Sequence, residues 1–141
     1  MKKRIILIIV SLGLFFLPSS QISYAADLTL NNTPAQIYFS PKGGCTEAIV
    51  KEIRNAKSEI YVQAYSFTSV PIVKALLDAH KRGIKVEAIL DKSQKKAKYT
   101  SATFLYNAGI PTYIDSKHAI AHNKVMIIDK EIVITGRNAV T

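Results

Sequence analysis

Apolar and polar positions follow two different periods along this chain. In the segment EIYVQAYS, residues 59–66, Ile60, Val62 and Ala64 alternate with polar or aromatic side chains, which is typical of a half-buried β-strand. The same pattern predicts strands at 35–40, 59–66, 84–90, 111–115, 122–129 and 131–136. A tight turn at 129–131 separates the last two, which therefore predict an antiparallel hairpin.

A period of three to four residues lies between these strands and predicts helices. The clearest helix has an apolar face formed by Val73, Leu76, Leu77 and His80. Ser69 is a typical N-cap for it, Pro71 fits its first turn, and Gly83 fits its end. Further helices are predicted at 46–56 and 101–107. Strands that alternate with helices indicate an α/β domain, with a mixed, mostly parallel sheet flanked by helices.

The first 26 residues differ from the rest of the chain. Three basic residues precede a thirteen-residue, mostly apolar run at 5–17, and the stretch ends in small residues. This is the layout of a secretory signal peptide with cleavage near Ala25 or Ala26. The run is shorter than the roughly 20 apolar residues that a membrane span needs. We expect a signal peptide at 1–25 and one domain at 26–141, exported to a periplasm or secreted; an uncleaved anchor is the alternative.

The chain is basic, with a formal charge of +9 that falls to +6 without the signal peptide. This favours an anionic partner, either nucleic acid or phospholipid head groups, although charge also aids solubility. The predicted loop at 91–100, either solvated or in contact with a polyanion, carries Lys92, Lys95, Lys96 and Lys98. The sequence contains no Gly-rich nucleotide loop and no Cys/His metal cluster, so we expect no cofactor and no metal.

The candidate chemistry lies near the C-terminus, in the segment AHNKVMIIDKEIVITG. Residues two apart share one face of a strand, so His122 and Lys124 are expected side by side. Histidine can act as a nucleophile or base near neutral pH, and lysine can hold a phosphate oxygen in the transition state. The pair therefore suits phosphoryl chemistry without a metal. Asp129 lies an odd number of residues from His122, so we expect it to face away and to cap the following turn.

The spacing His-x-Lys-x4-Asp, met by His122, Lys124 and Asp129, resembles the signature of the phospholipase D superfamily. The resemblance is closest to the small exported nucleases with one motif per chain, and it covers about residues 35–136. It implies that these three residues are catalytic in a phosphodiesterase with a covalent phosphohistidine intermediate. One histidine would attack phosphorus and a second would protonate the leaving oxygen. Because this chain has one motif, the resemblance also implies a homodimer that shares one active site.

After the motif the chain departs from the family pattern. In Gly136-Arg137-Asn138-Ala139 the asparagine comes one position early, so Asn138 is a candidate phosphate ligand by resemblance alone. The family continues with a closing strand and helix, whereas this sequence stops at Thr141. We therefore expect a C-terminally incomplete fold, either in a fragment or in a truncated gene product.

Three functions compete on this evidence. The first is an exported non-specific endonuclease, which the lysine loop and the net charge favour. The second is a phospholipase D that hydrolyses phospholipid head groups, for which an apolar entry surface beside His122 would be typical. The third is an inactive nucleic-acid-binding fragment. Of the other histidines, His80 is expected to pack on its helix, and His118 to lie in a solvated loop before the motif.

Overall fold

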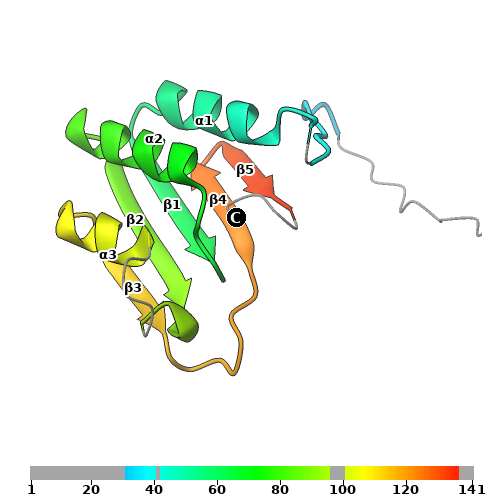
Figure 1. The fold of residues 1–141 in the computed structure, drawn as a ribbon. Coiled ribbons are helices and arrows are strands. Elements are labelled where there is room, and N and C mark those ends of the chain that lie inside the picture. Colours follow the sequence, from blue (N-terminus) through cyan, green and yellow to red (C-terminus); the bar gives the residue numbers. More distant parts are fainter. Residues whose placement is uncertain (1–30, 41, 96–100, 137–141) are drawn as a thin grey trace, which may run out of the picture. The chain divides into compact units, whose positions relative to one another are not determined.

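The computed structural model describes residues 31–40, 42–95 and 101–136 of the chain (Figure 1). The chain divides into two units, residues 1–35 and 36–141, and the helices and strands described below belong to the second. The predicted signal peptide, Asn138 and part of the lysine loop lie outside the described residues. No helix in the described ranges is long and apolar enough to cross a membrane.

Five strands form one mixed sheet in the order β3-β2-β1-β4-β5. Their bounds are Glu59–Ala64 for β1, Lys85–Asp91 for β2, Thr112–Asp115 for β3, Lys124–Ile128 for β4 and Ile132–Thr135 for β5. β2 lies parallel to β1 and β3, whereas β4 lies antiparallel to β1 and β5. The predicted mixed α/β sheet with its closing hairpin is thus confirmed. Parallel pairings make up half of the described sheet rather than most of it.

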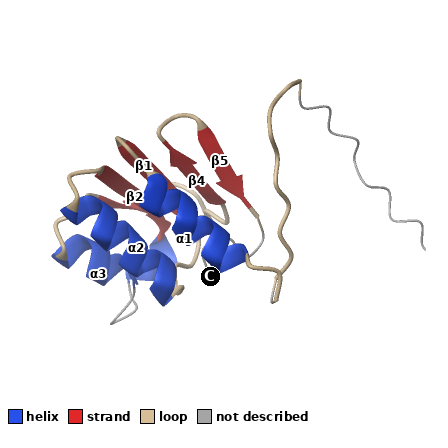
Figure 2. Ribbon diagram, turned by 90° about the horizontal axis from the view of Figure 1, so that it is seen from above, coloured by secondary structure: helices blue, strands red, loops and turns tan. Residues whose placement is uncertain are grey.

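Three α-helices cover one face of this sheet (Figure 2). Their bounds are Cys45–Asn55 for α1, Val70–Lys81 for α2 and Ser101–Asn107 for α3, and a short 3-10 helix, η1, follows β2 at Lys92–Lys95. Ser69 is the N-cap residue of α2, but its side chain makes no capping hydrogen bond. Pro71 in the first turn and the buried face of α2 therefore define its start. Gly83 follows its end with φ 89°, a left-handed conformation that glycine adopts without strain.

The hydrophobic core lies between the helices and the sheet. Alternate residues of β1 are buried and pair with alternate residues of β4, in the pairs Ile60–Ile128, Val62–Met126 and Ala64–Lys124. Ile53, Leu76 and Leu105 bring one fully buried side chain from each α-helix. Burial of a side chain of this size contributes roughly 1.5–3 kcal/mol. Lys124 shares the face of these core residues, so its side chain points to the helix-covered side.

Two strand predictions differ from the structure. Residues 35–40 are not a strand, and Ile37 and Phe39 are 81% and 76% exposed. A strand needs a hydrogen-bonded neighbour, and none of the five described strands pairs with this segment. The strand predicted at 122–129 begins only at Lys124, so His122 belongs to the preceding loop.

Candidate active site at the carboxyl edge of the sheet

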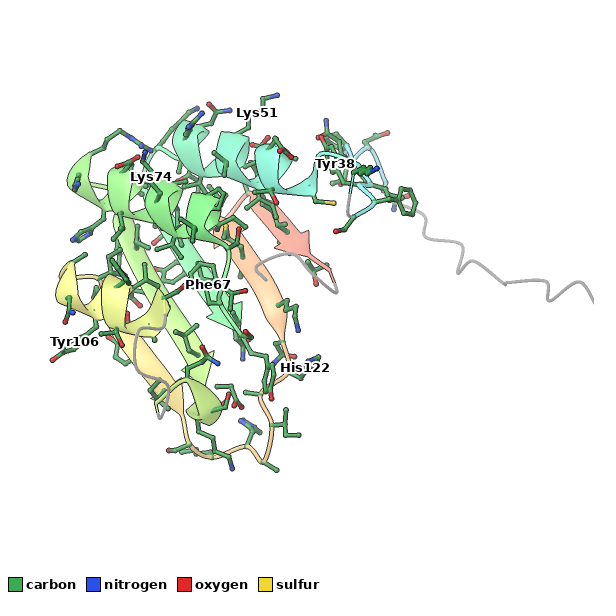
Figure 3. The ribbon with its side chains drawn as sticks, viewed as in Figure 1. Tyr38, Lys51, Phe67, Lys74, Tyr106 and His122 are labelled. Atoms are coloured by element: carbon green, nitrogen blue, oxygen red, sulfur yellow. The ribbon has the colours of Figure 1, made fainter. Side chains whose placement is uncertain are left out.

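The three parallel strands β1, β2 and β3 end at Ala64, Asp91 and Asp115, on the same side of the sheet. We call this side, where the carboxyl ends of the strands lie, the carboxyl edge. β4 runs in the opposite direction, so its first residue, Lys124, lies at the same edge and pairs with Ala64. β1 has β2 on one side and β4 on the other, so the chain connections diverge at this strand. Ligand sites in open α/β sheets commonly lie outside the carboxyl ends of strands at such a point. His122 of the motif lies at this edge (Figure 3).

The structure brings His122 and Lys124 together. Lys124 Nζ lies 3.4 Å from His122 Nε2. The imidazole is exposed, whereas Lys124 is only 8% exposed. An ammonium group has donors and no acceptor, so Lys124 can donate to the ring nitrogen in the tautomer that leaves a lone pair there. A histidine nitrogen that keeps its lone pair can attack phosphorus.

Lys124 is largely buried, and its ammonium group pairs with no carboxylate among the residues that the structure describes. Three ion pairs occur among the described residues, and none of them involves Lys124. A buried charge costs free energy unless it is paired. A bound anion at the open edge would supply the missing charge. The arrangement of Lys124 beside His122 therefore suits an anion bound at this edge of the sheet.

Tyr65, the residue after β1, forms a third side of the site. Its ring centroid lies 4.7 Å from that of His122, at an interplanar angle of 56°, and 5.8 Å from Lys124 Nζ. Its backbone N–H donates to the carbonyl of Asn123 at 3.0 Å. The aromatic contacts orient the imidazole and partly compensate the cation. Sequence reasoning did not single out Tyr65; its place directly after the central strand is the signal that could have found it.

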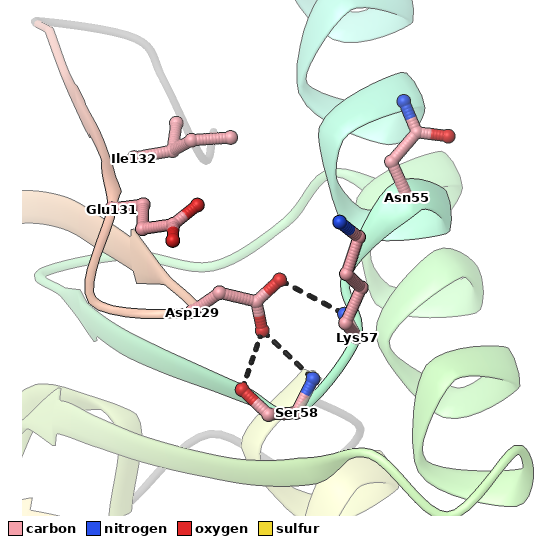
Figure 4. A pocket seen from close by; sticks show the side chains of 6 residues that line it. All are labelled: Asn55, Lys57, Ser58, Asp129, Glu131 and Ile132. Atoms are coloured by element: carbon pink, nitrogen blue, oxygen red, sulfur yellow. Dashed lines mark hydrogen bonds between the residues drawn. The ribbon is translucent and has the colours of Figure 1, made fainter.

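Asp129 caps a segment that is distant in the sequence. Its carboxylate accepts hydrogen bonds from the backbone N–H groups of Lys57, Ser58 and Glu59 at 2.9, 2.8 and 3.0 Å. Ser58 Oγ donates a fourth bond at 2.8 Å (Figure 4). These bonds, led by that of the Lys57 N–H, hold the pKa of Asp129 far below its usual range because they stabilise the ionised form.

Asp129 is not brought together with His122 and Lys124. It follows the last residue of β4, whereas Lys124 is the first. Its side chain points away from the candidate site, in the direction that the odd spacing predicts. It caps the connection between α1 and β1, however, rather than its own turn. A catalytic role for Asp129 stays a prediction. Its observed hydrogen bonds to residues 57–59 are those of a residue that stabilises the fold.

The other histidines occupy different surroundings. His80 lies near the end of α2, where its Nε2 atom is close to Gly109 in the turn after α3. His118 is exposed, and its Nδ1 atom lies 2.7 Å from Asp115 Oδ2 at the end of β3. The pKa of Asp115 is lowered, mainly by this contact. In the part of the chain that the structure describes, no group of three or more His, Cys, Asp or Glu side chains could hold a metal ion.

Comparisons with known proteins identify the family of this chain. Residues 49–137 match the family described as "Cardiolipin synthase, PLD-like domain". Among solved structures, Nuc, a phospholipase D family member from Salmonella typhimurium, is 37% identical with a TM-score of 0.69, over 75% of this chain and 71% of that one. NucT from Helicobacter pylori is 27% identical with a TM-score of 0.56, over 66% and 65% of the two chains.

Curated relatives carry related names. "Phospholipase D" of Rickettsia prowazekii is 43% identical over 122 residues, which cover 86% of this chain and 60% of the relative. The chain thus spans about 60% of the length of the Rickettsia prowazekii and Rickettsia typhi proteins that it matches. "Mitochondrial cardiolipin hydrolase" of Mus musculus is 27% identical over 88 residues, or 62% of this chain and 40% of that one. The family match over more than half of the sequence, together with the likeness to Nuc, shows that the chain belongs to the phospholipase D superfamily of phosphodiesterases.

Proposed function

We propose that this protein hydrolyses phosphodiesters of nucleic acids, with His122 as the nucleophile and Lys124 as the cation that holds the phosphate. The observation that supports this most is the 3.4 Å contact between the exposed His122 imidazole and the ammonium group of Lys124. Lys124 is a largely buried lysine that lacks a carboxylate partner among the described residues. Lys124 would stabilise the charge that grows on a non-bridging oxygen as the bond to His122 forms.

The reaction divides into two displacements at phosphorus. In the first, the lone pair of His122 Nε2 forms a P–N bond, the P–O bond to the leaving group breaks, and a second histidine gives its proton to the leaving oxygen. In the second, that histidine removes a proton from a water molecule as the water oxygen attacks phosphorus. The P–N bond then breaks, and its electron pair returns to His122. Each histidine ends in its starting state.

The second histidine would come from a second copy of this chain. His80 lies near Gly109 at the turn after α3, and the His118 ring is engaged by Asp115. Neither contact places these rings beside His122. A symmetric dimer duplicates every group of a site that lies on its two-fold axis. Two copies of His122 and Lys124 around one phosphate would supply nucleophile, acid and paired cations.

The preference for nucleic acid rests on charge. The domain that remains without the predicted signal peptide carries a formal charge of +6. Lys92 and Ser93 begin η1 directly after β2, at the same edge as His122. A domain that binds mainly through phosphate contacts should lose affinity steeply as salt rises. Export of the domain by residues 1–25 is part of the same proposal.

A phospholipid is the second candidate substrate, and an apolar groove favours it. The groove lies between α2 and α3 and is lined by Phe67, Thr68, Val70, Val73, Lys74, Leu77, Ser101 and Phe104. Val70 and Phe104 are 74% and 60% exposed, and Phe67 lies two residues after Tyr65, which contacts His122. An acyl chain could lie in this groove while its phosphate contacts Lys124.

One experiment separates these functions. The mature chain is assayed in EDTA on supercoiled plasmid DNA and on phosphatidylcholine vesicles, beside His122→Ala and the control His80→Ala. We expect nicking of DNA that His122→Ala abolishes and His80→Ala leaves intact. Turnover of lipid alone would select the second candidate, and a Val70→Ser/Phe104→Ser variant should then lower it. Binding of DNA without any turnover would identify a nucleic-acid-binding fragment.

A further inference from the structure

Asp91 is the most deeply buried acidic residue among the described residues, at 2% exposure. It is the last residue of β2 and lies at the same sheet edge as His122. None of the three ion pairs among the described residues includes it. A buried carboxylate without a cation must be stabilised by hydrogen bonds. The contacts of its two oxygens therefore show what the residue does.

Each oxygen of Asp91 accepts one backbone hydrogen bond. Oδ2 accepts the N–H of Ala121 at 2.8 Å, and Oδ1 accepts the N–H of Ser93 at 2.8 Å. The Ala121 bond and then the Ser93 bond hold the pKa of Asp91 below its usual value, so the group is ionised at neutral pH. Ala121 lies thirty residues away in the sequence. The carboxylate thus links the start of η1 to the loop that precedes β4, two segments that are far apart in the sequence.

These two bonds reach the loop that carries His122 and the short helix η1. Ala121 directly precedes His122, which lies outside the strand ladder. Two hydrogen bonds therefore hold the backbone on either side of His122. The Ala121 N–H donates to Asp91, and the Asn123 carbonyl accepts from the Tyr65 N–H. The second bond of Asp91 holds Ser93 of η1, which carries Lys92 at the same edge.

We propose that Asp91 is a positioning residue of the active site, which fixes the backbone of His122 through the Ala121 N–H and the lysine-bearing η1 through the Ser93 N–H. The inference rests on the proposed role of His122 as the reacting group. An ionised carboxylate accepts both N–H groups in strong, charge-assisted bonds, which no neutral side chain of this size can do. A displacement of about 1 Å at a reacting group can lower turnover by about a hundredfold, so loss of one bond should reduce the rate.

The variant Asp91→Asn tests this with almost no change in volume. The carboxamide keeps one acceptor oxygen but turns its NH2 group toward the second N–H, so one of the two bonds is lost. Glu87→Gln is the matched control, because Glu87 lies on the same strand and is partly buried, but pairs with Lys85. We expect kcat on a small phosphodiester to fall about tenfold to a hundredfold in Asp91→Asn, with little change in KM, and no change in Glu87→Gln.

A spectroscopic readout separates positioning from general loss of stability. In 1H–15N spectra of the imidazole groups, Asp91→Asn should shift or broaden the His122 signals and leave those of His80 unchanged. This measurement requires no activity, so it remains informative if the proposed reaction is wrong. An unchanged His122 signal with unchanged kcat would overturn the proposal. So would equal disturbance of His80 and His122, which would show a global defect.

The wild-type protein offers a second test if the variant does not fold. The Ala121 amide lies outside every described strand, yet its bond to Asp91 should slow its exchange with solvent. We expect it to exchange at least tenfold more slowly than the amide of Ile120, the exposed residue beside it. Exchange of both amides at the same rate would refute the anchoring role of Asp91.

Discussion

Lys124→Met should separate activity from stability, because the role proposed for Lys124 is to hold the phosphate of a substrate rather than to stabilise the fold. Methionine keeps an unbranched chain of similar length, so the apolar stem of the side chain stays packed. Position 124 pairs with Ala64 on the face that also buries Met126. The replacement removes a charge that has no carboxylate partner in the described part of the chain.

The magnitudes follow from these contacts. Loss of one group that stabilises transition-state charge typically costs a factor of about 10²–10³ in kcat, or about 2.7–4 kcal/mol. Replacement of buried charged groups by well-packed apolar ones is often neutral or stabilising by about 1–4 kcal/mol. At roughly 4 °C per kcal/mol for a domain of this size, Tm should stay equal or rise by several degrees while turnover falls at least a hundredfold.

The assay measures plasmid nicking in EDTA and thermal melting on the same preparation. Lys85→Met is the control, because Lys85 is an exposed lysine of β2 that pairs with Glu87. It should keep full activity and gain no stability. Turnover of Lys124→Met near the wild-type level would refute the role of the ammonium. A drop in Tm of Lys124→Met together with its activity would show that Lys124 stabilises the fold.

Three other predictions concern the remaining groups. Asp129→Asn should lower Tm at pH 7. Because the folded-state pKa of Asp129 is depressed, the stability that its ionised carboxylate contributes is present above the unfolded-state pKa of about 3.9. That contribution is lost as pH falls through the folded-state pKa. The difference in urea stability from wild type should therefore shrink in acid, and a constant difference would contradict the assigned cap. His122→Ala should remove activity at unchanged Tm, which melting and nicking assays on one sample would check. Activity should sediment with a dimer, so full activity in a strictly monomeric fraction would exclude the shared site.

Local pattern was sufficient for the helices and for most strands. The segment predicted as a helix at 101–107 is α3 with the same bounds, and alternation identified β1 because one of its faces is buried. Such signals are local, since each depends on side chains a few residues apart. Residues 35–40 show the limit. Their alternation resembles that of β1, but no described strand pairs with them, and sequence alone does not reveal the missing partner.

The sequence by itself also determined the superfamily, because His122, Lys124 and Asp129 form a spacing that can be recognised without a structure. Only the tertiary structure decided how the three differ. Antiparallel insertion of β4 beside β1 brings Tyr65 against His122, and Lys124 faces the buried side. The partners of Asp129 and of Asp91 lie about 70 and 30 residues away along the chain. Contacts at such separations depend on strand order and direction, which local periodicity does not encode.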